Sequence, residues 1–204
     1  MPRSVDLKRS QQSDAIVAAT LEALRKHGYA ATSLQRVAEE ANVSKRMLLH
    51  YFPSRQALFE TAVRRLCRQI LEQVESAVAG ARPADALRDG LALLWEEIID
   101  DPGLHGVFFG LIAESVTDPS LRPTITAVRE EYRELIARQI MAAHGPADPI
   151  SPARAAGLAT LILGTFVGLT VDYLERGDSP ALQLALTEFQ RLVAVTVAPT
   201  PSPR

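Results

Sequence analysis

Apolar residues recur at every third or fourth position along most of this chain, which is the spacing of helices that bury one face. Between residues 55 and 78 they follow one another in steps of four, at Leu58, Ala62, Leu66, Ile70 and Val74. No segment alternates as a strand does, so the expected fold class is all-α. Gly and Pro divide the pattern into about nine helices. We place them at about residues 13–27, 32–41, 45–52, 55–78, 84–100, 105–116, 120–144, 153–176 and 181–197.

The segment 32–41 is the first of two short helices that organise the N-terminal part of the chain. Thr32 and Gln35 have the spacing of a capping box, which marks a helix start. Four apolar side chains then fall on one stripe, at i, i+3, i+4 and i+7. They are Leu34, Val37, Ala38 and Ala41.

The second short helix follows directly, after the turn Asn42-Val43-Ser44. Asn tolerates a left-handed backbone, and Ser44 can cap the helix that begins after it. Leu48 and Phe52 point toward the core from this helix. Four residues are left pointing outward, namely Lys45, Arg46, Leu49 and His50. Two crossed short helices with cations at the start of the second are typical of a helix-turn-helix, which lays its second helix in the major groove.

Residues 15–63 resemble the N-terminal domain of tetracycline-repressor (TetR) family regulators. The matching pieces are L-x-x-x-G-Y ending at Tyr29, T-S-L-x-x-V-A beginning at Thr32, A-x-V-S ending at Ser44, and L-x-x-Y-F-P-S-R-x-x-L-F ending at Phe59. The resemblance covers about a quarter of the chain. It departs from the usual pattern at Arg46, where a small residue is common, at Leu49 in place of Tyr, and at Tyr51 in place of His.

The resemblance implies a transcriptional regulator, usually a repressor, that binds double-stranded DNA. We expect a helix-turn-helix DNA-binding domain at residues 1–54, an effector-binding and dimerisation domain at 55–197, and a disordered Pro-rich tail at 198–204. Lys45 and Arg46 are the candidates for base edges, and Leu49 for a thymine methyl group. Six residues are expected at phosphates. They are Thr32 and Ser33 through backbone N–H groups, and Ser44, His50, Tyr51 and Arg55.

Two of these assignments have alternatives. Tyr51 is either a phosphate contact or partly a core residue. The polar N-terminus, residues 1–12, is either a loose solvated tail or an arm that brings Arg3, Lys8 and Arg9 to the DNA.

The helix at 153–176 is apolar nearly all round and carries three glycines, which cost about 1 kcal/mol each in a helix interior. Close approach of another helix is the simplest reason for them. We therefore expect the helices at 153–176 and 181–197 to pack against their copies in a homodimer, which implies a palindromic operator. The expected interface residues are Gly157, Leu161, Gly164, Gly168, Leu186 and Phe189.

The resemblance also implies a small-molecule effector site in the C-terminal domain. Its expected walls are mostly apolar, which favours a hydrophobic or aromatic effector. The alternative for each wall residue is that it fills the core. The candidates are Trp95, Phe108, Phe109, Phe166 and Tyr173 as walls, with His105, Glu114 and Asp172 as polar anchors.

Charge is distributed unevenly over the 204 residues, although the formal net charge is only −2. Residues 1–80 hold 12 Lys and Arg against 8 Asp and Glu, whereas residues 81–204 hold 10 against 16. A basic N-terminal part fits one that meets a polyanion. Cys67 is the single cysteine, and no apolar signal segment begins the chain, so we expect a cytoplasmic protein. The longest uncharged run, 155–171, is shorter than the ~20 residues that cross a bilayer, and no membrane partner is expected.

Catalysis, metal binding and cofactors are not expected. The histidines lie far apart, at positions 27, 50, 105 and 144, and none has the spacing of metal ligands. No nucleophile elbow, P-loop or dinucleotide-binding motif occurs. The competing hypotheses are a helical protein-interaction adaptor and a DNA-binding regulator, such as an architectural protein, that has no effector.

Overall fold

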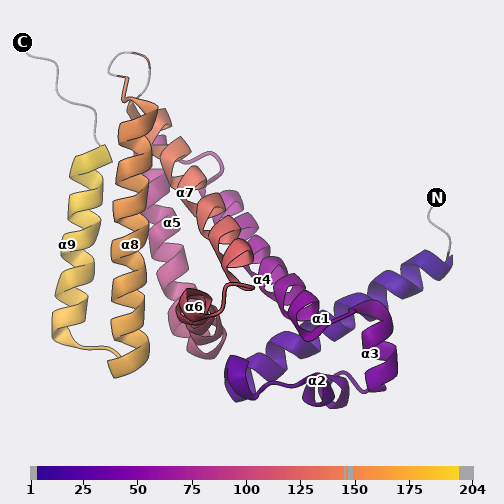
Figure 1. Cartoon of the computed structure of the whole chain (residues 1–204). Coiled ribbons are helices and arrows are strands. Elements are labelled where there is room, and N and C mark those ends of the chain that lie inside the picture. The colour runs from indigo at the N-terminus through magenta and orange to yellow at the C-terminus, as the bar shows by residue number, and fades with distance from the viewer. Residues whose placement is uncertain (1–3, 145, 147–148, 198–204) are drawn as a thin grey trace, which may run out of the picture. The chain divides into compact units, whose positions relative to one another are not determined.

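The computed structural model describes residues 4–144, 146 and 149–197, and within these ranges the chain forms nine helices and no strand (Figure 1). The predicted all-α fold class is confirmed. The helices are α1 (Ser4–Ala31), α2 (Leu34–Glu40), α3 (Lys45–Tyr51), α4 (Arg55–Val78), α5 (Pro83–Asp100), α6 (Pro102–Thr117), α7 (Arg122–His144), α8 (Pro152–Arg176) and α9 (Pro180–Val197).

The chain divides into two compact units. The first comprises Met1–Arg68 and Gly103–Thr126, and the second comprises Gln69–Pro102 and Ala127–Arg204. Helix α4 is continuous and contributes residues 55–68 to the first unit and 69–78 to the second. This is a division by compactness, and the functional boundary after residue 54 stays a prediction.

The core of the first unit is made by the apolar faces of α1 to α4. Ile16 and Leu24 of α1, Leu48 of α3 and Leu58 of α4 have no exposed surface. Burying a side chain of this size contributes about 1.5–3 kcal/mol. The short helices α2 and α3 are therefore held mainly by tertiary packing, since helices of seven residues are not stable alone.

The core of the second unit is one apolar cluster between α5, α7, α8 and α9. Each helix contributes residues spaced three, four or seven apart, as the sequence pattern predicts. Its buried members are Leu87, Leu91, Ile98, Ile136, Ile140, Ala155, Ala159, Ile162, Phe166, Phe189 and Val193.

Helix α1 is longer than predicted. It begins at Ser4 instead of residue 13, because no Gly or Pro interrupts residues 4–27 and several good helix formers lie there. The prediction that residues 4–12 are loose is therefore wrong, and Lys8 and Arg9 belong to the helix. Arg3 and the predicted disordered tail at 198–204 lie outside the described residues.

Helix α8 has two different faces. By length and composition it is the one helix among the described residues that is apolar enough to cross a membrane, and 28% of its apolar window is buried. Ile162 is buried on one face, whereas Leu161 is 64% exposed. In the single chain, one face of the helix is therefore left uncovered.

Candidate nucleic-acid interface and ligand cavity

The start of α2 is fixed by Gly28 and Thr32. Gly28 has φ +71° and breaks the direction of α1, a conformation that favours glycine. The buried Thr32 hydroxyl donates to the carbonyl oxygen of Gly28 at 2.7 Å and lies 3.1 Å from that of Ala23. The predicted capping box at Thr32 is wrong, because this hydroxyl is used by α1. Ser33 is the N-cap instead, and its Oγ accepts from the Arg36 amide at 3.3 Å.

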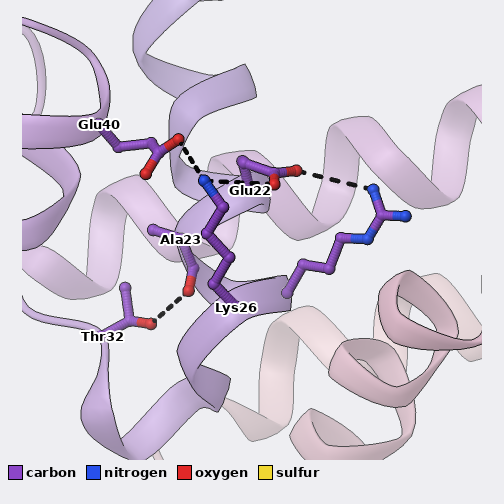
Figure 2. Close-up of polar contacts among 6 residues, drawn as sticks. Glu22, Ala23, Lys26, Thr32 and Glu40 are labelled. Atoms are coloured by element: carbon purple, nitrogen blue, oxygen red, sulfur yellow. Dashed lines mark hydrogen bonds and ion pairs between the residues drawn. The ribbon is translucent and has the colours of Figure 1, made fainter.

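An ion-pair cluster joins α1 to the end of α2 (Figure 2). Lys26 Nζ lies 2.8 Å from Glu40 and 3.5 Å from Glu22. The hydrogen bond to Glu40 is the largest cause that raises the pKa of Lys26. These side chains are exposed, and such pairs contribute little to stability. Through Lys26 they connect α1 to the end of α2.

Helix α3 begins as the sequence predicts. Asn42 in the preceding turn has φ +51°, and Ser44 Oγ accepts a hydrogen bond from the Met47 amide at 3.1 Å. Leu48 and the C-cap residue Phe52 are buried. These contacts bury one side of α3 and leave the opposite side to solvent.

The exposed side of α3 carries the three predicted base-reading residues and the predicted phosphate contact His50. Lys45, Arg46, Leu49 and His50 are all exposed. Sequence reasoning missed Met47, which is 45% exposed; its place one residue before the buried Leu48 could have indicated this. A helix about 10–12 Å wide with two cations at its start matches the width of the major groove, about 12 Å.

Tyr51 and Arg55 do not lie as fully exposed phosphate contacts would. Tyr51 is half-buried and its ring meets that of His50 edge-on at 5.5 Å. Arg55 is also half-buried, and its Nε donates to the carbonyl oxygen of Thr32 at 2.9 Å. Ser33 and Ser44 remain exposed at the starts of α2 and α3.

The predicted effector residues fall in different units. In the second unit, Trp95 meets the rings of Phe166 at 6.1 Å and Tyr173 at 5.5 Å, and Asp172 forms an ion pair with Arg176 at 3.4 Å. The others belong to α6 in the first unit, where His105 is buried and Glu114 is exposed. Phe108 and Phe109 of α6 contact each other at 5.5 Å. Neither unit by itself contains the whole predicted set.

The second unit contains an apolar cavity of about 40 Å³ between α4, α5, α7 and α8. Of the predicted effector residues, only Phe166 lines it. Helix α5 approaches α4 closely at Gly90, since a Cβ there would lie 3.2 Å from Val74 Cγ1 and that side chain would have to shift. Tyr132 and Gln139 are the polar side chains of its wall. The lining residues are Val74, Val78, Ala86, Leu87, Gly90, Leu91, Leu94, Tyr132, Leu135, Ile136, Gln139, Leu163 and Phe166.

An apolar face extends over the outer side of α8 and α9. Its groove has a volume of about 400 Å³ and is lined by both helices. A Cβ at Gly157, Gly164 or Gly168 would meet nothing within 4 Å, so no close approach inside this chain explains these glycines. Of the other predicted interface residues, Leu186 and Phe189 are buried in the chain itself. Leu161 and Leu192 line the groove and are exposed, and Leu184 and Val195 are further exposed apolar residues of α9.

Within the described residues, no group of three His, Cys, Asp or Glu side chains is placed to hold a metal ion.

Comparison with known proteins points to one family. Residues 16–62 match the sequence model of bacterial regulatory proteins of the tetR family. The HTH-type transcriptional regulator RutR of Escherichia coli K12 is 29% identical over 145 residues, which span 70% of this chain and 68% of RutR. The HTH-type transcriptional regulator BetI of Burkholderia cenocepacia is 26% identical over 166 residues, spanning 79% of this chain and 81% of BetI.

A solved structure agrees with the fold. The TetR transcription regulator of Haloarcula marismortui superposes with a TM-score of 0.77 over 91% of this chain and 98% of its own, at 19% identity. This likeness supports the arrangement of helices, and the sequence relatives support the class of protein.

Proposed function

Because this chain belongs to the tetR family of bacterial regulatory proteins, DNA-binding transcriptional regulators, we propose that it is an effector-responsive repressor acting in the cytoplasm. The observation that carries the proposal is α3. Its buried side is anchored by Leu48, and its exposed side begins with Lys45 and Arg46. Such a helix can enter the major groove without unfolding its own support.

We assign the operator contacts from the exposure of the side chains. Lys45 and Arg46 read base edges, and Leu49, with its exposed neighbour Met47, packs on thymine methyl groups. Phosphates are held by Ser44 and His50, and by N–H groups at the start of α2 after Thr32 and Ser33. Tyr51, half-buried, reaches the backbone only with its hydroxyl.

The repressor acts as a homodimer through the apolar face of α8 and α9. Gly157, Leu161, Gly164 and Gly168 lie at i, i+4, i+7 and i+11 on α8, and the three glycines are open, which lets a second helix approach closely. To read two half-sites, such a homodimer has to present its two copies of α3 one DNA turn, ~34–36 Å, apart. The operator is then palindromic.

The effector is a small apolar molecule that enlarges the cavity of the second unit. At about 40 Å³ the cavity admits only a few atoms, so a ligand has to move its walls. A ligand shifts the regulator only by its different affinity for the free and DNA-bound states. The mostly aliphatic wall, with Tyr132 and Gln139 as polar groups, favours an uncharged ligand.

A fluorescence-anisotropy titration tests DNA binding. The purified protein is added to labelled DNA from upstream of its own gene and to a shuffled fragment, each at two salt concentrations. We expect tighter binding to the upstream fragment and a fall in affinity with salt. Equal affinity for both fragments would overturn the proposed operator specificity, and no binding by a folded protein would overturn the function.

A second titration tests the effector. Small uncharged aliphatic and aromatic compounds are added to the preformed complex, with charged analogues of similar size as controls. We expect release by members of the uncharged set. Release by charged analogues alone would contradict the assignment of an apolar effector.

A further inference from the structure

We propose that Arg55 is a positioning residue that fixes the helix-turn-helix to the first turn of α4, and that it is not a phosphate contact. The inference rests on the proposed DNA binding and concerns how the reading helix is held in place. It departs from the expectation that a cation at the start of α4 faces the DNA backbone.

The guanidinium of Arg55 is already engaged inside the first unit. Its Nε donates to the carbonyl oxygen of Thr32 at 2.9 Å, and its Nη2 donates to that of Tyr29. Tyr29 lies in the last turn of α1 and Thr32 in the connection to α2, and the C-terminal carbonyls of a helix carry partial negative charge. The planar fork of arginine suits two acceptors held at a fixed separation.

Two aromatic rings complete the site around this guanidinium. Its Cζ lies 4.4 Å from the ring centroid of Tyr29 and 4.4 Å from that of Phe59, within the range of cation–π contacts. The two rings meet edge-on at 5.5 Å, and Phe59 is one turn further along α4 and almost fully buried. A phosphate would therefore compete for a guanidinium that two carbonyls and two rings already hold.

The contacts of Arg55 lead directly to the helix that supports α3. The hydroxyl of Thr32, whose carbonyl Arg55 holds, is tied to α1. The next residue, Ser33, is the N-cap of α2. One side chain of α4 therefore links the end of α1 to the start of α2, and a displacement of the first turn of α4 would be passed to α2 through Thr32.

Lysine cannot reproduce this arrangement. It keeps the positive charge, but it is a point charge without the planar fork and stacks less well on rings. Substitution by Lys therefore separates the two roles, because a phosphate contact needs mainly charge, whereas the positioning role needs the shape of the guanidinium.

The experiment measures operator affinity against salt for wild type, Arg55→Lys and Arg55→Gln, well below the melting temperature of each variant. The matched control is Arg68→Lys, an exposed arginine on the same helix. Lys45→Gln calibrates the loss of a DNA-facing charge. Amide hydrogen exchange of the first turn of α2 is followed in parallel, without DNA.

We expect both Arg55 variants to lose affinity about tenfold, as for one lost charge-assisted hydrogen bond, with the wild-type salt slope. Amides at the start of α2 should exchange faster, and Arg68→Lys should behave as wild type. The proposal is overturned if Arg55→Lys binds normally while Arg55→Gln lowers the slope by about 0.9, the signature of one phosphate contact. It is also overturned if both variants bind as wild type, whatever their melting temperatures, since Arg55 would then only support the fold.

Failure of the proposed function gives a different result. If wild type binds no operator fragment, the proposed DNA-binding function is wrong, and so is the role of Arg55 in positioning α3 for DNA. Faster amide exchange at the start of α2 in Arg55→Lys would then still support a structural connection from α4 to α2 through Arg55. Unchanged exchange would contradict that connection too.

Discussion

Single hydroxyl groups hold much of the geometry of the DNA-binding unit, and Thr32 is the clearest example. Replacing it by Val keeps the shape and removes the donor to the Gly28 carbonyl. Because Thr32 is 1% exposed, the variant leaves no buried donor for the part-buried Gly28 carbonyl. We expect a loss of about 1–3 kcal/mol in the free energy of unfolding, measured by urea titration at fixed protein concentration.

Thr20→Val is the matched control. Thr20 is also fully buried, but its hydroxyl donates to the carbonyl of Ile16 four residues before it, within the same helix. That carbonyl keeps its helical N–H partner, so the loss should be smaller. Equal losses for Thr20→Val and Thr32→Val would contradict a special role for the contact between α1 and α2.

Arg46 is the residue on which we expect sequence preference to depend most. Its side chain is exposed at the start of α3, so Arg46→Ala should leave stability unchanged. It should cost about 1–3 kcal/mol of discrimination at one base position. The measurement compares wild type and variant on a set of operators with single base changes. A uniform loss on every operator would instead identify Arg46 as a phosphate contact.

At the scale of the element, α3 depends on its N-cap because it has only seven residues. Ser44→Ala removes the acceptor for the Met47 amide. We expect the free energy of unfolding to fall by about 1 kcal/mol, and the first amides of α3 to exchange faster with solvent. Hydrogen exchange followed residue by residue measures this.

The corresponding change in α2, Ser33→Ala, tests whether the effect is local. The Ser33 cap bond holds the start of α2, so its loss should disturb α2 and leave the first turn of α3 protected. The bond is longer than that of Ser44, 3.3 Å against 3.1 Å. Faster exchange of α3 in Ser33→Ala as well would mean that the two helices open together.

Elements that are set by local chemistry could be predicted from the sequence, and those set by tertiary contacts could not. The cap at Ser44 and the left-handed turn at Asn42 depend on residues within three positions, and both were predicted. The contacts of Arg55 lie 23 and 26 positions away. No spacing in the sequence brings these carbonyls to the start of α4.

The candidate ligand cavity was missed for a similar reason. Aromatic residues such as Trp95 were favoured because aromatic walls are common in binding sites. The cavity is instead lined mainly by aliphatic residues that the helical pattern assigns to an ordinary core. Its position depends on how closely α5 approaches α4 at Gly90, which only the tertiary structure gives.

At the scale of the molecule, we expect the apolar face of α8 and α9 to determine the state of assembly. A charge at its centre should prevent a second copy from covering it, because burying an unpaired carboxylate is costly. We expect Leu161→Glu to convert a dimer into a monomer in sedimentation experiments at micromolar concentration, with the helical content unchanged.

Val116→Glu is the matched control. Val116, on α6, is 73% exposed and lies outside this face, so this variant should remain a dimer. A wild-type protein that sediments as a monomer, or a Leu161→Glu variant that stays dimeric, would contradict dimerisation through this face.

The open apolar side of α8 also sets how sharply the regulator responds to its own abundance. If two chains must join before both half-sites of an operator are occupied, the binding equilibrium involves two protein chains and one operator, and mass action governs it. Wherever separate chains predominate and most operators are empty, occupancy grows with the square of their concentration. A cell that doubles its copy number in that range would then quadruple the fraction of bound promoters, a nonlinearity that originates in uncovered leucines far along the sequence from the reading helix.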